Sequence, residues 1–245
     1  MIHNLSFVIH NYYLILHKYS LINMKIKSIA ALWAIAMLPV NAYADIDLKA
    51  TYTDKDGSEV VTSADFTAEA PLTVTFQSNP SNLDAKAAIE WHIKNQTTGT
   101  SLTRYEQDMT YTLTEAGVTE FKLQVRLDNE VIEEASIRIT ISESHLEMPN
   151  AFSPNGDGIN DVFKAKSNHK SIVEFHAYIF NRYGQKVYDW TDINGGWDGT
   201  QHGRPVKDGV YFVYVKARGA DKVDYEIRRD VNLLRNFNET TNSTP

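Results

Sequence analysis

The sequence predicts an all-β protein built as two β-sandwiches in tandem behind a cleaved signal peptide. Apolar residues alternate with polar ones in short runs such as Leu72–Phe76, Phe121–Leu127 and Ile137–Ile141, and this period is typical of half-buried strands. Turn-forming residues separate the runs, and no stretch beyond the leader keeps a helical period. About 200 residues remain for the mature chain, which is enough for two such domains.

The first 44 residues have the layout of a secretory signal. Met24–Lys27 forms a short basic start, Ile29–Val40 is apolar, and Ala42 and Ala44 supply the small residues that signal peptidase reads. We therefore expect translation to start at Met24 and cleavage to follow Ala44. An uncleaved anchor is the alternative, but 12 apolar residues are few for a bilayer span, which needs about 20.

Charge and cysteine content exclude several classes of protein. The formal net charge is −7, and the predicted leader contains no acidic residue, so the mature chain is more acidic still. An acidic surface repels the phosphates of nucleic acids, so we expect no nucleic-acid partner. The chain has no cysteine, which removes disulfides, thiolate metal sites and cysteine nucleophiles.

The first domain carries a second, more specific pattern. Glu69–Phe76, Glu90–Ile93, Tyr111–Gly117 and Phe121–Val125 together resemble a PKD domain, which is an immunoglobulin-like sandwich. The resemblance implies that Trp91 is a core residue of that sandwich and does not form a substrate platform.

The second domain is expected to begin its strand set over residues 172–180 and to continue through 185–190. Strong strand patterns follow over 209–217 and 223–234, with Gly219–Lys222 between them, which predicts a β-hairpin.

Four ordered blocks in this region resemble one family. Met148–Asp161 is dense in Pro, Gly, Asn and Asp, and Phe180–Tyr188, Gly196–Gly199 and Lys207–Phe212 follow it. Over roughly residues 146–235 they resemble the gliding-motility-associated C-terminal domain, the type B sorting domain of the bacterial type IX secretion system. The signature residues implied by this resemblance are Phe152, Ser153, Pro154, Asn155, Gly156, Asp157, Gly158, Asn160, Asp161, Asn181, Arg182, Gly184, Trp197, Asp198, Gly199, Gly209 and Tyr211.

The resemblance implies a secretion route rather than a catalytic activity. It predicts export through the periplasm and across the outer membrane, display at the cell surface, and the type IX translocon as a partner. We expect a PKD-like passenger or spacer over 45–143, the sorting domain over 144–235, and a disordered polar tail over 236–245. The passenger would bind a surface protein or a glycan, and the mature chain would have no transmembrane span.

Two loops offer competing interpretations. Asn155, Asp157 and Asp161 present oxygen ligands of the kind that calcium prefers, but the terminal Glu of a twelve-residue calcium loop is missing. A turn that hydrogen-bonds to its own backbone is the favoured alternative, so we expect no cofactor. Arg182 is either a docking contact or a solvated residue in a turn that Asn181 caps, and the sequence leaves both open.

The chain is not expected to be an enzyme. Its histidines lack metal-ligand spacing, its serines lack a Gly-x-Ser-x-Gly elbow, and Glu133 and Glu134 would point to opposite faces of a strand. The alternative function is an extracellular carbohydrate-binding module or an accessory hydrolase component, with Trp91, Trp197 or the tyrosines as sugar contacts.

Overall fold

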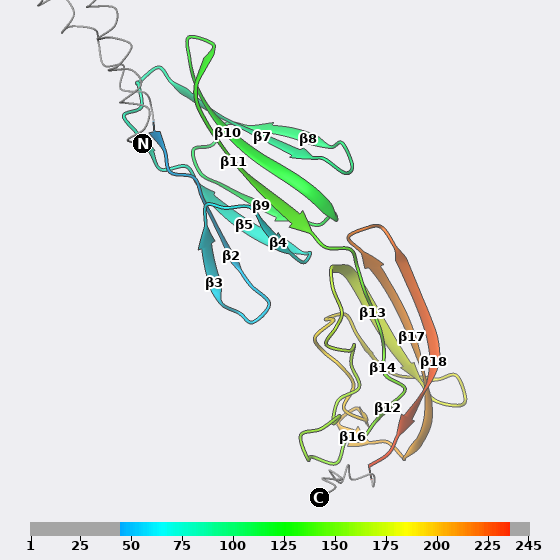
Figure 1. Ribbon diagram of the computed structural model, residues 1–245. Coiled ribbons are helices and arrows are strands. Elements are labelled where there is room, and N and C mark those ends of the chain that lie inside the picture. Colours follow the sequence, from blue (N-terminus) through cyan, green and yellow to red (C-terminus); the bar gives the residue numbers. More distant parts are fainter. Residues whose placement is uncertain (1–44, 236–245) are drawn as a thin grey trace, which may run out of the picture. The chain divides into compact units, whose positions relative to one another are not determined.

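A computed structural model describes residues 45–235, and every regular element in that range is a β-strand (Figure 1). The predicted all-β fold is therefore confirmed. The predicted leader and the predicted disordered tail lie outside the described residues. The range that the structure describes contains no helix with the length and apolar character needed to cross a lipid bilayer.

The N-terminal part of this range forms two sheets whose strands are mostly antiparallel. The four-stranded sheet has the order β3-β2-β5-β9, and the five-stranded sheet has the order β4-β11-β10-β7-β8. A short pair, β1 with β6, stands beside them. The strands are β1 (Asp45–Ile46), β2 (Lys49–Thr53), β3 (Glu59–Thr62), β4 (Phe66–Ala68), β5 (Leu72–Gln77), β6 (Pro80–Ser81), β7 (Ala88–Asn95), β8 (Ser101–Arg104), β9 (Met109–Leu113), β10 (Gly117–Leu127) and β11 (Glu130–Ile141).

Strand alternation builds the first core. In β5, Leu72, Val74 and Phe76 are buried while the residues between them are exposed, because successive side chains point to opposite faces of a strand. Trp91 is fully buried, and its ring centroid lies 5.6 Å from that of Phe76. The expectation that Trp91 is a core residue is therefore confirmed.

The C-terminal part is one five-stranded sheet with the order β12-β18-β17-β13-β14. Its inner face is covered by long irregular segments and by the short pair β15–β16 rather than by a second extended sheet. The strands are β12 (Ala151–Phe152), β13 (Ile172–Phe180), β14 (Lys186–Trp190), β15 (Thr200–Gln201), β16 (Arg204–Pro205), β17 (Gly209–Gly219) and β18 (Asp224–Leu233).

The turn between β17 and β18 contributes to the first core. Ala220 is buried and packs with the core residues of the two N-terminal sheets. Its carbonyl accepts a hydrogen bond from the Ala116 amide at 2.9 Å, and Lys222 forms an ion pair with Glu115. The hairpin predicted from Gly219–Lys222 is present, and it also joins the two parts of the chain.

Candidate functional site

The loop after β12 is organised by one carboxylate. Asp161 accepts backbone hydrogen bonds from Asn155 at 2.9 Å and Gly156 at 2.7 Å through Oδ1, and from Gly158 at 2.8 Å through Oδ2. These bonds, led by that from Gly156, hold the pKa of Asp161 below its ordinary value, because they stabilise the charged form.

Asn155 and Asp157 form further hydrogen bonds within the same loop. The Asp157 amide donates to Asn155 Oδ1 at 3.0 Å, and the Ile159 amide donates to Asp157 Oδ1 at 2.8 Å. The Asn155 side-chain amide donates to Asp157 Oδ2 at 2.9 Å. The oxygens offered as calcium ligands are thus all bonded to donors of the loop itself, which is the geometry of a self-capped turn. The described residues hold no group of three or more His, Cys, Asp or Glu side chains that would suit a metal ion.

The bonds to Asp161 predict that the stability of this loop depends on pH. Since its folded-state pKa is lowered, its stabilising contribution is complete above the ordinary Asp pKa of about 3.9 and is lost as pH falls through the lowered value. We expect the Gly156 and Gly158 amide proton shifts to move toward random-coil values below about pH 4, and Asp161→Asn to move them already at pH 7. Asp157→Asn is the control, because neither glycine amide donates to that side chain; equal shifts in both variants would contradict the role of Asp161.

The block Gly196–Gly199 forms the centre of the second core. Trp197 is fully buried, and its indole Nε1 donates to the Thr200 carbonyl at 2.7 Å. Its backbone pairs with Phe163 through two hydrogen bonds of 2.8 and 2.9 Å. The Trp197 ring therefore lies inside the fold and does not project into solvent.

Residues of two signature blocks, Gly196–Gly199 and Lys207–Phe212, meet at Arg235. Its guanidinium donates to the Gly199 carbonyl at 2.8 Å and to Asp208 Oδ1 at 2.6 Å. Its backbone amide donates to Asp208 Oδ2 at 2.9 Å. Nearby, the Tyr211 hydroxyl donates to the Lys207 carbonyl at 2.8 Å, and burial raises the pKa of that phenol. These contacts tie the end of the described chain to two of the signature blocks.

The turn between β13 and β14 combines a cap with exposed side chains. Asn181 Oδ1 accepts from the amides of Tyr183 at 2.9 Å and Gln185 at 3.1 Å, and Gly184 takes a positive φ of 76°. Arg182 lies over the Tyr183 ring, 4.9 Å from its centroid, and Tyr183 is 73% exposed. Asn181 thus caps the turn as one interpretation predicted, while Arg182 and Tyr183 remain accessible.

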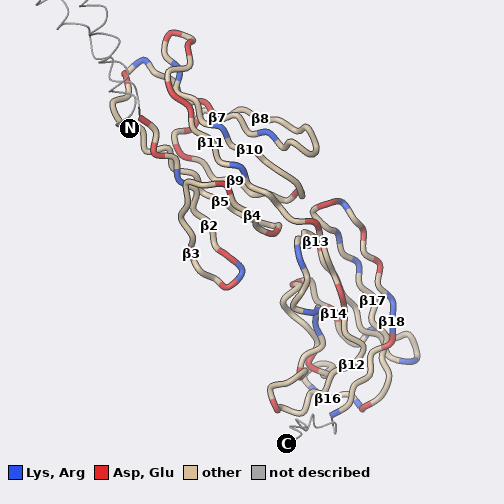
Figure 2. Tube along the Cα trace, viewed as in Figure 1, with Lys and Arg blue, Asp and Glu red and all other residues tan. Residues whose placement is uncertain are grey.

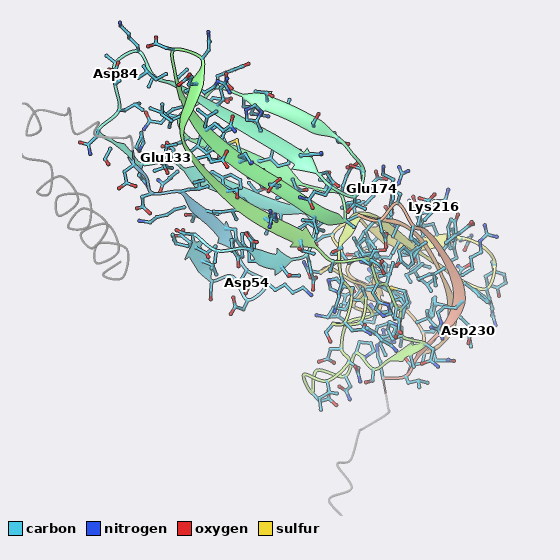
Figure 3. All side chains as sticks on the ribbon, turned by 45° about the horizontal axis from the view of Figure 1, so that its top comes forward. Asp54, Asp84, Glu133, Glu174, Lys216 and Asp230 are labelled. Atoms are coloured by element: carbon cyan, nitrogen blue, oxygen red, sulfur yellow. The ribbon has the colours of Figure 1, made fainter. Side chains whose placement is uncertain are left out.

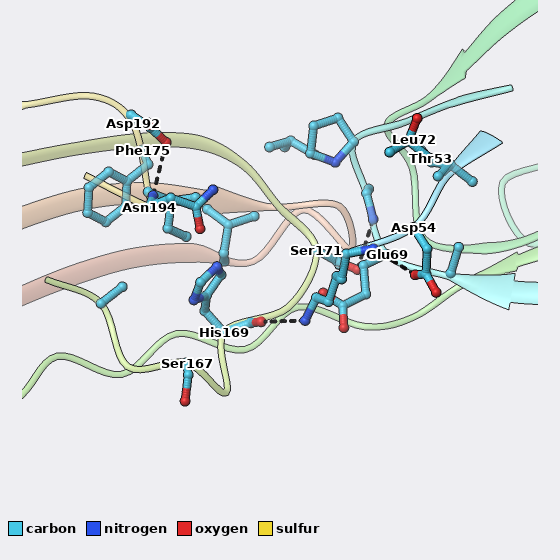
Figure 4. A pocket seen from close by; sticks show the side chains of 18 of the residues that line it. Thr53, Asp54, Glu69, Leu72, Ser167, His169, Ser171, Phe175, Asp192 and Asn194 are labelled. Atoms are coloured by element: carbon cyan, nitrogen blue, oxygen red, sulfur yellow. Dashed lines mark hydrogen bonds and ion pairs between the residues drawn. The ribbon is translucent and has the colours of Figure 1, made fainter. Parts of the chain in front are cut away.

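Among the cavities is a groove of about 740 Å³, drawn in Figure 4. Lys55 on its wall forms an ion pair with Glu69 at 2.6 Å and donates to the His169 carbonyl at 3.3 Å. Ser171 accepts from the Ala70 amide at 3.2 Å, and His169 Nδ1 lies 2.8 Å from the Lys166 carbonyl. Lys55 and Ser171 thus connect distant segments of the fold, whereas the His169 side-chain contact is local.

The predicted signature residues all lie in the C-terminal domain, but they have different structural roles. Asn155, Asp157, Asp161 and Asn181 cap loops, and Trp197 fills the core. Sequence reasoning missed the partners that these residues use, chiefly Phe163, Thr200, Asp208 and Arg235. Asp208 lies inside the recognised block Lys207–Phe212, and Phe163 and Thr200 closely follow two other blocks. The pairings of Phe163 with Trp197 and of Arg235 with Asp208 join distant parts of the sequence, so no local pattern could reveal them.

Comparisons with known proteins support the C-terminal assignment. Residues 146–227 match the family model of the CHU_C type IX secretion signal domain, which confirms the predicted resemblance for that part of the chain. The PKD-like identity of the first domain stays a prediction. No curated protein matches the chain.

One similar solved structure is SGBP-B of the Bacteroides ovatus mixed-linkage glucan utilization locus, in complex with a mixed-linkage heptasaccharide. It is 13% identical, the match covers 79% of this chain and 48% of that one, and the TM-score is 0.28. The chain spans about half the length of that protein, and a likeness at this TM-score supports no inference about function.

Proposed function

We propose that this protein is exported by the type IX secretion system to the outer cell surface, and that residues 144–235 are the folded domain that the export machinery recognises. The match of residues 146–227 to a type IX secretion signal domain carries this proposal. The bonds that join distant signature blocks support it further, because a signal spread over such a span is readable only as a folded unit.

We further propose that residues 45–143 are a non-catalytic passenger or spacer, delivered through the periplasm after removal of the leader. The Lys55, Glu69 and Ser171 side chains of the groove support this view, because each is bonded to another segment of the fold. The alternative of a carbohydrate-binding module loses two of its proposed sugar contacts, since the Trp91 and Trp197 rings are both buried.

Truncation tests the proposed function. In cells with an active type IX system, the full chain should become accessible to protease added outside, whereas a chain ending after Glu143 should stay in the periplasm. A chain ending after Arg235 is the matched control and should reach the surface, because it keeps the bonds from Arg235 to Asp208 and Gly199.

The truncated chain needs a folding check, because removal of Ala220 opens part of the first core. Resistance of the periplasmic fragment to limited proteolysis provides that check. Surface exposure of a folded 45–143 fragment at the level of the full chain would refute the proposal.

A further inference from the structure

One face of the C-terminal sheet carries large apolar side chains where polar ones are expected. In β13 and β17 the inner positions, such as Ile179 and Val213, are buried, and the residues between them point outward. The outward residues form a continuous set, here called the outer aromatic face, made of His176, Tyr178, Phe180, Val210, Phe212 and Tyr214. Val210 is 50% and Phe212 46% exposed. The solvated face of an antiparallel sheet is normally polar, so this face has the composition of a contact surface.

The strand register gathers these side chains into one patch. Phe180 is paired with Phe212 and Tyr178 with Tyr214 across β13 and β17. The ring centroids of Tyr178 and Tyr214 are 6.1 Å apart with an interplanar angle of 25°. The exposed turn with Arg182 and Tyr183 directly follows Phe180, so the patch continues to the end of the sheet.

Neighbouring groups cover faces of the two tyrosine rings in this patch. The His176 ring stacks on Tyr178 with centroids 4.0 Å apart, and the Arg228 guanidinium lies 4.9 Å from the centroid of Tyr214. A sugar that stacks on an aromatic ring needs an open ring face. Aliphatic and aromatic side chains of a protein can instead pack against ring edges, which favours a protein as the occupant.

Charges around the patch neutralise one another. Lys186 forms an ion pair with Asp189 at 2.8 Å, and Arg228 pairs with Glu226 on the same strand. Figure 2 shows basic and acidic residues interspersed along β17 and β18, and Figure 3 labels two of them, Lys216 and Asp230. A partner would therefore be selected by apolar contact more than by long-range charge, and its own contact surface should be apolar and nearly uncharged.

Three of the signature residues offer no contact surface to a partner. Asp161 and Asn181 bond to their own loops, and Trp197 is buried, so they shape the domain without presenting a contact. We propose that the outer aromatic face is the surface through which a protein of the type IX export machinery holds this domain, with apolar side chains of that protein packed against it. This inference rests on the proposed function and adds the docking surface to it.

A double variant tests the docking surface in the full chain. Val210→Thr with Phe212→Thr removes exposed apolar area and places at both positions a β-branched residue that suits a strand. In cells with an active type IX system we expect its surface-accessible fraction to fall at least about tenfold, as expected when interface anchors are truncated. The matched control is Val61→Thr with Leu102→Thr, at first-domain positions that are 56% and 43% exposed, and it should be exported normally.

Export of the unmodified chain distinguishes a failure of the proposed function from a failure of the docking inference. If that chain does not reach the surface, the proposed function fails; if it does and the double variant follows it undiminished, only the docking inference is overturned. Near-UV circular dichroism of the purified variant checks its fold, and Val210→Lys tests the same patch at a single exposed position.

Other occupants of the face would also overturn the inference. Sedimentation of the purified chain would reveal a dimer that the double variant abolishes while export continues. Affinity electrophoresis in mixed-linkage β-glucan would reveal retention that the variant abolishes while export continues.

Discussion

Replacing Trp197 by alanine is expected to lower the free energy of unfolding of the C-terminal domain by about 3–5 kcal/mol. The ring is fully buried and lies 5.2 Å from Phe152 and 5.0 Å from Tyr211, centroid to centroid. Alanine would leave a cavity among these rings and would also leave the Thr200 carbonyl without its 2.7 Å donor. Urea unfolding followed by tyrosine and tryptophan fluorescence measures the effect.

Trp190 gives a matched control for the indole hydrogen bond. It is also buried, but its Nε1 has no hydrogen-bond partner among the described residues. Trp190→Phe should therefore cost less stability than Trp197→Phe, because it removes an unpaired donor rather than a bonded one. A larger loss for Trp190→Phe, or a loss below about 1 kcal/mol for Trp197→Ala, would contradict the central role given to Trp197.

The second large effect is expected at Gly196. A Cβ at this position would lie 2.6 Å from the Phe163 carbonyl oxygen and 2.6 Å from a Val162 methyl group. Gly196→Ala should therefore push apart the two backbone segments that Phe163 and Trp197 join, at a cost of about 1–3 kcal/mol.

Gly195→Ala is the matched control for this substitution, because the nearest atom to its added Cβ is the Asp192 carbonyl oxygen at 3.1 Å. The free energies of unfolding of the two variants, measured by urea denaturation, give the comparison. Equal destabilisation by the two substitutions would show that the close approach at Gly196 does not decide the effect.

Much of the strand pattern follows from local sequence. The run predicted over 172–180 coincides with β13, and the predicted hairpin is formed by β17 and β18. Sequence analysis did not place β2 or the shorter strands β3, β4 and β8, which are three or four residues long and lie at sheet edges. Strands this short carry too few alternating residues for a period to be recognised, and β4 depends on a parallel pairing with distant β11.

The candidate site was predictable as a set of residues but not as a set of roles. Loop chemistry indicated that Asn155 and Asp157 would bond within their own turn, and the structure has those bonds. The contacts of Arg235 could not be predicted, because they cross 27 and 36 residues of sequence. The outer aromatic face was also hidden, since β17 is apolar on both faces and such a run is typical of a strand covered on both sides.

The most direct test of the account is the location of the full chain in two otherwise identical strains, one with a functional type IX system and one without. Protease added to intact cells should digest the protein only in the first strain, and the second should accumulate a periplasmic form processed after Ala44. The same distribution in both strains would contradict the claim that residues 144–235 direct export by this system.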